Sequence, residues 1–152
     1  MLPFENMLKK KGSDIAIFMG TGPSINLITK ENISLINEWD KWSVNNFIFH
    51  NFIIPNFYHP EIKAHRDGSI MHLLCKDKYD QYKDVNWVID DTRRNLLEYV
   101  GLYPNIYSYQ KDISDKLNQS GLHYPEGNRL KLRCYASMSL VLEMMVRMGY
   151  KK

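Results

Sequence analysis

A glycine-rich turn, Gly20-Thr21-Gly22-Pro23-Ser24, follows a short apolar run and is the segment best suited to bind a ligand. Glycine lets a phosphate approach the backbone closely, and a helix that starts after such a turn offers unpaired N–H groups and a positive dipole end. Ser24 adds a hydroxyl. The spacing is neither G-x-G-x-x-G nor a P-loop, because no Gly-Lys-Ser/Thr follows. Two interpretations stay open: a phosphate site, or an ordinary tight turn that needs glycine for a positive φ.

Other polar side chains could take part in chemistry, but each also has an ordinary structural explanation. The five histidines are His50, His59, His65, His72 and His123. None of them forms the i, i+4 pair of a helical metal site, so no metal site is predicted. Two of them, His50 and His59, lie near expected strand ends. The pair Asp90 and Asp91 could reach a metal or a ribose, or could cap the helix that follows.

The elements that must position these residues alternate between strand and helix patterns. Strands are expected at Asp14–Gly20, Trp42–His50, Phe52–Tyr58, Val85–Asp90 and Asn105–Tyr109. Helices are expected from an N-cap at Ser24 to Ile28, and at Lys30–Trp39, Ala64–Asp84, Thr92–Tyr99, Lys111–Gln119 and Leu132–Met148. The last helix is apolar on nearly all sides, which is typical of a buried helix. The alternation predicts an α/β fold with a mostly parallel, Rossmann-like sheet flanked by helices.

Within that sheet, Asp14–Met19 is expected to be the central strand. Trp42–Phe49 and Val85–Asp90 are expected beside it, and Leu132–Met148 is expected to pack against one face of the sheet. A fully buried, apolar strand such as the first one is typical of the middle of a parallel sheet.

Length and composition predict one domain. The 152 residues carry a net charge of +3 and are 44% hydrophobic, enough for a core, so we expect a single domain over 14–152 after a polar, basic lead-in over 1–13. Cys75 and Cys134 form no disulfide framework or zinc motif, which favours a reducing, cytoplasmic compartment. The mild basic charge suits an anionic ligand, and Lys9–Lys11 predict at most a weak association with the inner face of a membrane. No nucleic-acid partner is expected.

The end of the chain suggests a longer parent. The helix over Leu132–Met148 has Gly149 at its C-cap, and a buried helix of this kind normally leads into another buried strand. Because the sequence stops at Lys152, we expect a truncated sheet whose last helix keeps apolar edges, which favours self-association into a homo-oligomer.

Three segments together resemble the bacterial sialyltransferases of glycosyltransferase family 42 and related cell-surface glycan enzymes. Their pattern has a strand followed by GNGPSL, a strand ending C-N-x-F-Y-F, an arginine-bearing segment and an apolar helix ending L-G-Y-K. The matching pieces here are Met19–Ser24, Val44–Phe49, Arg133 and Met148–Lys151. The similarity also takes in Pro55–Tyr58 at the third strand.

The resemblance implies a site for a CMP-sugar, the sialic acid donor, and a glycan acceptor. Gly20, Gly22 and Ser24 would line the phosphate and nucleotide edge. Asn45 matches an asparagine that contacts the nucleotide, whereas Thr21 replaces an asparagine and weakens that contact. Arg133 lies near the family's arginine, one residue further from the Gly-Tyr pair. The family's catalytic histidine lies beyond the equivalent of Lys152, so no catalytic residue is assigned and no cofactor besides the donor is expected.

Two other functions remain open. The hydroxymethylpterin pyrophosphokinase-like proteins share a GxGPS-type start, but they need carboxylates for Mg²⁺, for which Asp90 and Asp91 are the close pair near a strand end. A non-catalytic remnant or binding domain is the third possibility. A thermal-shift comparison of CMP, CMP-sialic acid, UDP-sugars and ATP with Mg²⁺ is expected to separate the three.

Overall fold

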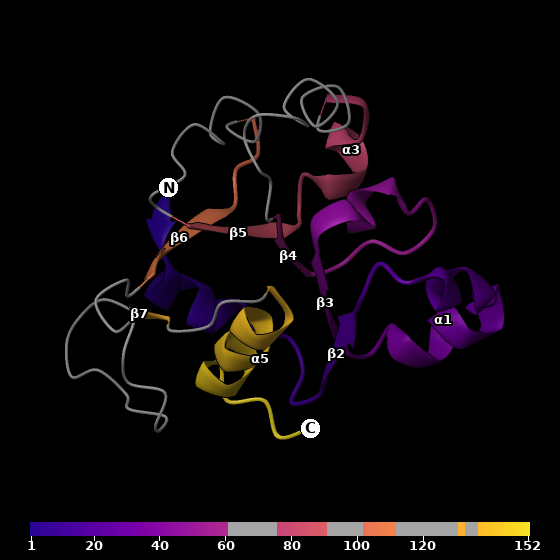
Figure 1. Cartoon of the computed structure of the whole chain (residues 1–152), viewed down its shortest axis with the longest axis horizontal. Helices are drawn as coiled ribbons and strands as arrows, with labels where there is room; N and C mark the ends of the chain where they lie inside the picture. The colour runs from indigo at the N-terminus through magenta and orange to yellow at the C-terminus, as the bar shows by residue number, and fades with distance from the viewer. Residues whose placement is uncertain (61–75, 91–101, 112–130, 133–136) are drawn as a thin grey trace.

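A parallel sheet organises the molecule (Figure 1). The computed structural model describes residues 1–60, 76–90, 102–111, 131–132 and 137–152. The strands are β1 (Leu2–Pro3), β2 (Ala16–Met19), β3 (Asp40–Val44), β4 (Phe57–His59), β5 (Asn86–Asp90), β6 (Ile106–Lys111) and β7 (Lys131–Leu132). Their order is β1-β6-β5-β4-β3-β2, β7 also pairs with β6, and every described pair is parallel. The predicted α/β fold with a parallel sheet is confirmed.

Helices cover both faces of the sheet. They are η1 (Phe4–Lys10), η2 (Pro23–Leu27), α1 (Lys30–Ile36), η3 (Asn45–Phe49), α3 (Tyr79–Tyr82) and α5 (Ser137–Arg147), where η marks a 3₁₀ helix. Alternate residues of each strand point to opposite faces, so Met19 and Trp87 belong to one core cluster while Trp42 and Val88 belong to the other. The first cluster packs against η2, α1, η3 and α3, and the second packs against η1 and α5.

The choice of face follows from the order of the strands. From β2 to β6 the chain steps across the sheet in one direction, and crossovers between parallel strands are right-handed, so η2, α1, η3 and α3 lie on one face. After β6 the chain returns to the β2 side of the sheet, and a right-handed return must use the other face. Helix α5 lies on that other face (Figure 1).

The central position expected for Asp14–Met19 is wrong. β2 is the last strand in the order, β3 is its neighbour as expected, and β5 is separated from it by β3 and β4. The outer edge of β2 is nevertheless occupied. Lys151 N–H donates to Asp14 O (2.8 Å), and Ala16 N–H donates to Lys152 O (2.9 Å). The residues after α5 therefore run along β2 on the side opposite β3. This is the side of the sheet to which the chain returns after β6.

A buried carboxylate holds this edge together. Asp40, at the start of β3, is 5% exposed, and its Oδ2 accepts hydrogen bonds from Gly12 N–H (2.9 Å), Ser13 N–H (3.2 Å) and the Tyr150 hydroxyl (2.7 Å). Trp42 Nε1–H donates to the same hydroxyl (3.4 Å). Burial and the Asp40 carboxylate raise the pKa of Tyr150, so its O–H stays protonated and keeps donating. One side chain thus joins the residues just before β2 to the segment just after α5.

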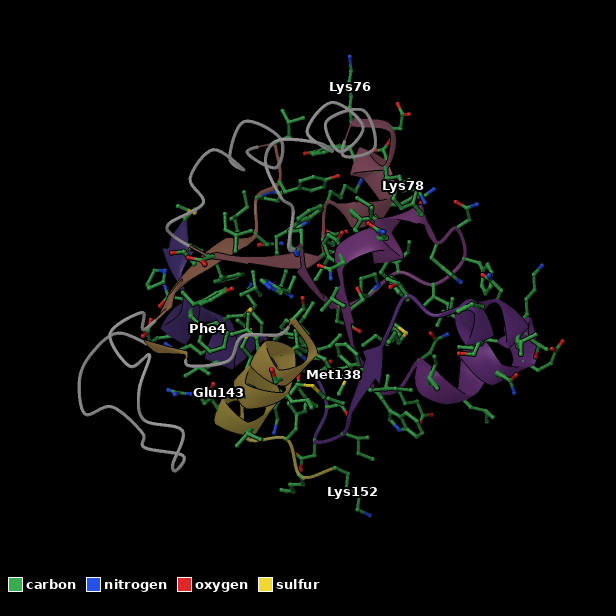
Figure 2. All side chains as sticks on the ribbon, in the orientation of Figure 1. Phe4, Lys76, Lys78, Met138, Glu143 and Lys152 are labelled. Atoms are coloured by element: carbon green, nitrogen blue, oxygen red, sulfur yellow. The ribbon has the colours of Figure 1, made fainter. Side chains whose placement is uncertain are left out.

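Residues 1–13 belong to the fold and are not a polar lead-in. Leu2 and Pro3 pair with Tyr107 and Ser108 of β6, and Phe4 and Met7 of η1 are fully buried. Figure 2 shows Phe4 on the side of the sheet that carries α5, and both belong to the same core cluster. The sequence did not predict the burial of this segment, because Phe4 and Met7 are its only buried positions and the residues that follow them are basic.

Three further elements differ from expectation. The strand expected over Trp42–His50 ends at Val44, and Asn45–Phe49 form η3. The strand expected over Phe52–Tyr58 starts only at Phe57, after Pro55. Helix α5 has an exposed apolar stripe, because Met138, Leu142 and Val146 are 56%, 42% and 63% exposed, so the helix is not buried on all sides. Self-association through that stripe stays a prediction.

The remaining elements agree with expectation or lie outside the described residues. Helix α1 is confirmed and begins with a capping box between Thr29 and Asn32. Gly149 ends α5 with φ of 74°, as a C-cap glycine does. Lys111, expected to begin a helix, is the last residue of β6, and the rest of that helix, 112–119, lies outside the described residues, as do the helix expected over 92–99 and most of the one over 64–84.

Removing the Tyr150 hydroxyl should loosen the β2 edge. We expect Tyr150→Phe to lower the free energy of unfolding by about 1–2 kcal/mol, because a charge-assisted hydrogen bond to a buried carboxylate is lost. Urea denaturation measures this. Tyr79→Phe, on a more exposed tyrosine, is the matched control and should change little. Equal effects of the two substitutions would contradict the role given to Asp40.

The ion pairs at the same edge predict a pH dependence. Hydrogen bonds from Lys11 (2.8 Å) and Lys151 (2.5 Å) lower the pKa of the exposed Asp14 carboxyl from 3.8 to about 2. A lowered folded-state pKa contributes stability that is present above about pH 4 and is lost as the pH falls toward 2. An NMR titration of Asp14 should show this low pKa, and Lys11→Met with Lys151→Met should return it toward 3.8. An unchanged titration in the double variant would refute the ion pairs.

Candidate ligand-binding site at the carboxyl ends of β2 and β3

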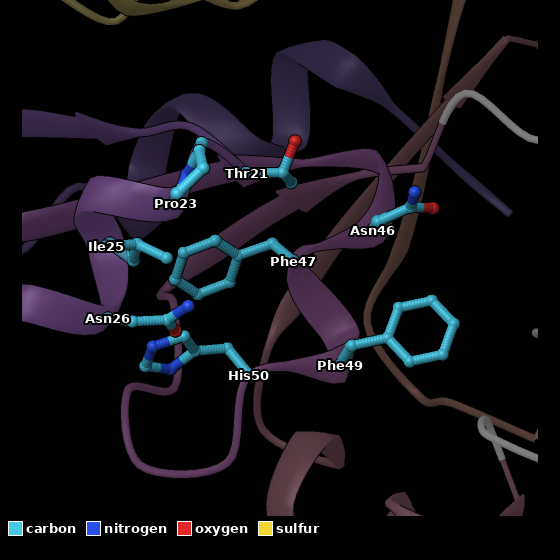
Figure 3. Close-up of a pocket in the computed structure, with 9 residues that line it drawn as sticks. Thr21, Pro23, Ile25, Asn26, Asn46, Phe47, Phe49 and His50 are labelled. Atoms are coloured by element: carbon cyan, nitrogen blue, oxygen red, sulfur yellow. The ribbon is translucent and has the colours of Figure 1, made fainter.

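A pocket lies just beyond the carboxyl ends of β2 and β3, where open parallel sheets bind their ligands. Its volume is about 410 Å³, within the range of small-molecule sites. One wall is the turn and η2 that follow β2, and the other is η3 with the residue after it (Figure 3). The lining residues are Thr21, Gly22, Pro23, Ile25, Asn26, Asn46, Phe47, Phe49 and His50.

The wall after β3 is shaped by one residue in a left-handed conformation. Asn45 has φ of 51°, which ends the extended strand and starts η3. The Tyr58 hydroxyl donates a hydrogen bond to Asn45 O, which holds the backbone of this turn in place. In a 3₁₀ helix, residues three apart lie above one another, so Phe47 and His50 stack with ring centroids 5.2 Å apart and planes within 16°.

His50 is held in one orientation and one protonation state. Its Nδ1 accepts a hydrogen bond from Ile53 N–H (3.3 Å), so the proton of the neutral ring lies on Nε2. Burial and the nearby Lys78 ammonium lower the pKa of His50, which keeps the ring neutral at pH 7. Lys78 itself donates to His50 O (2.9 Å) and Asn51 Oδ1 (3.0 Å). The buried Nε2–H has no hydrogen-bond partner among the described residues.

The two glycines of the turn are not required by the backbone. Neither Gly20 nor Gly22 has a positive φ, so the tight-turn interpretation is wrong. A Cβ on Gly20 would meet only Phe18 at 4.0 Å, and one on Gly22 only Ser24 Oγ at 3.9 Å, both ordinary contacts. Gly22 lines the pocket, so the absence of a side chain there leaves the backbone of the turn accessible.

The structure brings some of the predicted site residues together and leaves others apart. Thr21 and Gly22 line the pocket, while Gly20 and Ser24 lie in the same turn outside the lining set. Asn45 Nδ2 donates to Ser137 Oγ (3.3 Å), and its neighbour Asn46 faces the pocket instead.

The turn also differs in detail from the expected helix start. Gly22, not Ser24, is the N-cap of η2, and Pro23 at the first position has no N–H to offer. η2 is a single 3₁₀ segment of only five residues. The backbone groups of the turn would therefore contribute more to the binding of an anion than the dipole of this helix would. Arg133, the remaining predicted site residue, lies outside the described residues.

The other candidates stand away from the pocket. His59 Nδ1–H donates to Val88 O (2.8 Å) and the ring packs edge-on against Tyr109, so this histidine is part of the core. Asp90 ends β5, which β4 separates from β3. The described residues contain no group of three His, Cys, Asp or Glu side chains that could hold a metal. Asp91, His65, His72 and His123 lie outside the part of the chain described.

Sequence reasoning missed the η3 wall. Asn46, Phe47, Phe49 and His50 were expected in a strand, where Phe47 and Phe49 would share a face. Two features of the sequence indicated this wall. Phe47 and His50 are three residues apart, and two asparagines precede them, a residue type that adopts the left-handed conformation more readily than most residues other than glycine.

Comparison of the chain with protein-family models, with curated proteins and with solved structures found no match. The similarity to glycosyltransferase family 42 is therefore still a prediction from the sequence. Of the helices described, none has the length and apolar character needed to cross a membrane. The geometry itself shows an α/β fold with a pocket at the carboxyl edge of its sheet, and the described lining of that pocket is partly aromatic and carries no charged side chain.

The left-handed turn at Asn45 can be tested through stability. We expect Asn45→Ala to cost about 1–2 kcal/mol, because alanine disfavours a positive φ and the bond to Ser137 is lost. Asn45→Gly loses the same bond but accepts the backbone conformation, so it should cost less. Thermal or urea unfolding of both variants measures the difference. If the alanine variant were the more stable of the two, the conformation assigned to Asn45 would be wrong.

Proposed function

We propose that this chain is a nucleotide-sugar-binding domain of the glycosyltransferase type, with a CMP-sugar as ligand. The observation that carries the proposal is Gly22. Its backbone conformation and its surroundings in the protein accept a side chain, yet the position is glycine and it lines the pocket. A ligand that approaches the backbone at this point gives the missing Cβ a reason.

The pocket offers suitable partners for the other parts of a nucleotide. Phe47 and Phe49 supply aromatic surface for a base, and the amides of Asn26 and Asn46 supply donors and acceptors for a base or a ribose. None of the nine described lining residues is charged, so the phosphate would be held by the exposed backbone and hydroxyl groups of residues 20–24 at the mouth. This division resembles many nucleotide sites, in which the phosphate lies on a glycine-rich turn.

The identity of the sugar and of the reaction follows from the sequence resemblance alone. Under this proposal the donor carries sialic acid, the acceptor is a cell-surface glycan, and the domain acts in the cytoplasm at the inner face of the membrane. Among the histidines described, His50 does not serve as general base, because its proton lies on Nε2 and its Nδ1 lone pair is engaged by Ile53 N–H. Binding by this chain is therefore the property to test first.

The pyrophosphokinase-like alternative gains no support from the described residues. It needs carboxylates at the phosphate site, and Asp90, the described member of the proposed pair, lies two strands away from the pocket.

A ligand panel distinguishes the functions. CMP and CMP-sialic acid should raise the melting temperature more than UDP-sugars do, whereas ATP with Mg²⁺ should do so for a pyrophosphokinase. A binding domain without catalysis gives the first pattern and no transfer.

Replacement of Gly22 is the sharpest test of the site. We expect Gly22→Ala to leave the free energy of unfolding within about 1 kcal/mol of the parent, since the backbone accepts alanine. The same change should weaken CMP binding about tenfold or more, because the new methyl group overlaps the ligand. Calorimetry with CMP and urea denaturation measure the two effects.

Gly20→Ala is the matched control, since it lies in the same turn and accepts a Cβ but does not line the pocket. A smaller loss of CMP affinity at position 20 than at position 22 is the expected order. Unchanged CMP affinity in Gly22→Ala would remove the main support for the proposal.

A further inference from the structure

The imidazole of His50 presents an unusual combination in the wall of the pocket. The side chain lines the pocket although the residue is only 9% exposed, and its Nε2 is a buried polar atom without a partner among the described residues. A buried donor without a partner is costly, so native proteins keep few of them. A group that supplies an acceptor to this nitrogen would recover the lost hydrogen bond.

The ring is prepared to donate in one direction. Ile53 N–H fixes Nδ1 as the acceptor, and Phe47 stacks on one face of the imidazole. Phe52 approaches the ring at a tilt, with centroids 4.1 Å apart, and is itself 46% exposed. An exposed side chain changes rotamer rapidly, so Phe52 can move without disturbing the core, and the subsite inferred below needs such a movement to expose the buried Nε2.

The surroundings favour a neutral acceptor over an anion. The nine described lining residues carry no charge, and the described cation that acts on His50, Lys78, donates to His50 O and Asn51 Oδ1. Burying a phosphate or carboxylate here would cost far more than burying a carbonyl. A flat carbonyl-bearing ring also suits the aromatic surface of Phe47 and Phe49.

We infer that His50 Nε2–H donates a hydrogen bond to a ring carbonyl of a pyrimidine base, and so selects the base of the bound nucleotide. This deepens the proposed function and rests on it, since it identifies which part of a nucleotide enters the inner end of the pocket. Cytosine and uracil both carry a ring carbonyl next to the glycosidic nitrogen, and adenine has no carbonyl. The site therefore prefers pyrimidine nucleosides to adenosine.

Two substitutions of the same residue separate the two ring nitrogens. Asparagine places an acceptor near Nδ1 and nothing at Nε2, so His50→Asn keeps the bond to Ile53 N–H and loses the donor. Glutamine places an amide N–H near the Nε2 position, so His50→Gln keeps the donor. We expect His50→Asn to weaken cytidine and uridine binding about tenfold, and His50→Gln to retain most of it.

The experiment is an NMR titration of the full chain and both variants with cytidine, uridine, adenosine and ribose 5-phosphate. In the parent chain, cytidine and uridine should shift the His50 Nε2–H resonance downfield and protect it from exchange, a readout that needs no variant to fold. Ribose 5-phosphate should instead perturb Gly22 and should bind equally to the parent chain and to His50→Asn.

The outcomes separate this inference from the proposed function. Binding of ribose 5-phosphate with no effect of either pyrimidine on His50 would overturn the inference and leave the nucleotide site standing. A pyrimidine effect on His50 without phosphate binding at Gly22 would support the carbonyl subsite and overturn the proposed function. Equal binding of adenosine and the pyrimidines would overturn the selectivity, and no binding at all would overturn both proposals.

Discussion

The carboxylate of Asp40 is the interaction on which the arrangement of the sheet depends. It accepts bonds from the backbone just before β2 and from Tyr150 just after α5, and it begins β3 itself. Three segments far apart in the chain are thereby joined at one buried oxygen. A Cβ on Gly12 would come within 3.2 Å of the other oxygen, so the close approach depends on glycine there. The cluster holds the amino ends of β2 and β3 side by side, and the pocket lies beyond their opposite, carboxyl ends.

The pocket has two walls with different physical origins. The turn after β2 contains glycines that its backbone conformation does not require, and the proposed ligand is what would account for them. The η3 wall is explained from within, by the left-handed Asn45 and by the stack of Phe47 on His50. The first wall suits a group that needs close backbone contact, and the second suits a flat ring. A nucleotide contains both.

The sequence predicted the kinds of elements better than their places. Apolar runs such as Val85–Asp90 were expected as strands because burial on both faces makes them uniformly apolar, and the structure confirms β5. The edge position of β2 could not be predicted, since the order of strands depends on pairings such as Ala16 with Lys152. At the site, the turn over 20–24 could be found from its glycines. Asn46 and Phe49 were instead expected in a strand, because the change from strand to 3₁₀ helix depends on a single backbone angle at Asn45.

The pairing of Ala16 with Lys152 also bears on how the protein is made. The ribosome synthesises β2 early, and it synthesises residues 149–152 only after all of the strands. The outer edge of β2 is therefore uncovered while the rest of the domain forms. Exposed edges of parallel sheets invite pairing with other chains. Lys11 and Asp14 place charges beside that edge in the interval, and they later bind Gly149 O and Lys151. The charges that lie beside the uncovered edge are thus the ones that later bind residues 149–151.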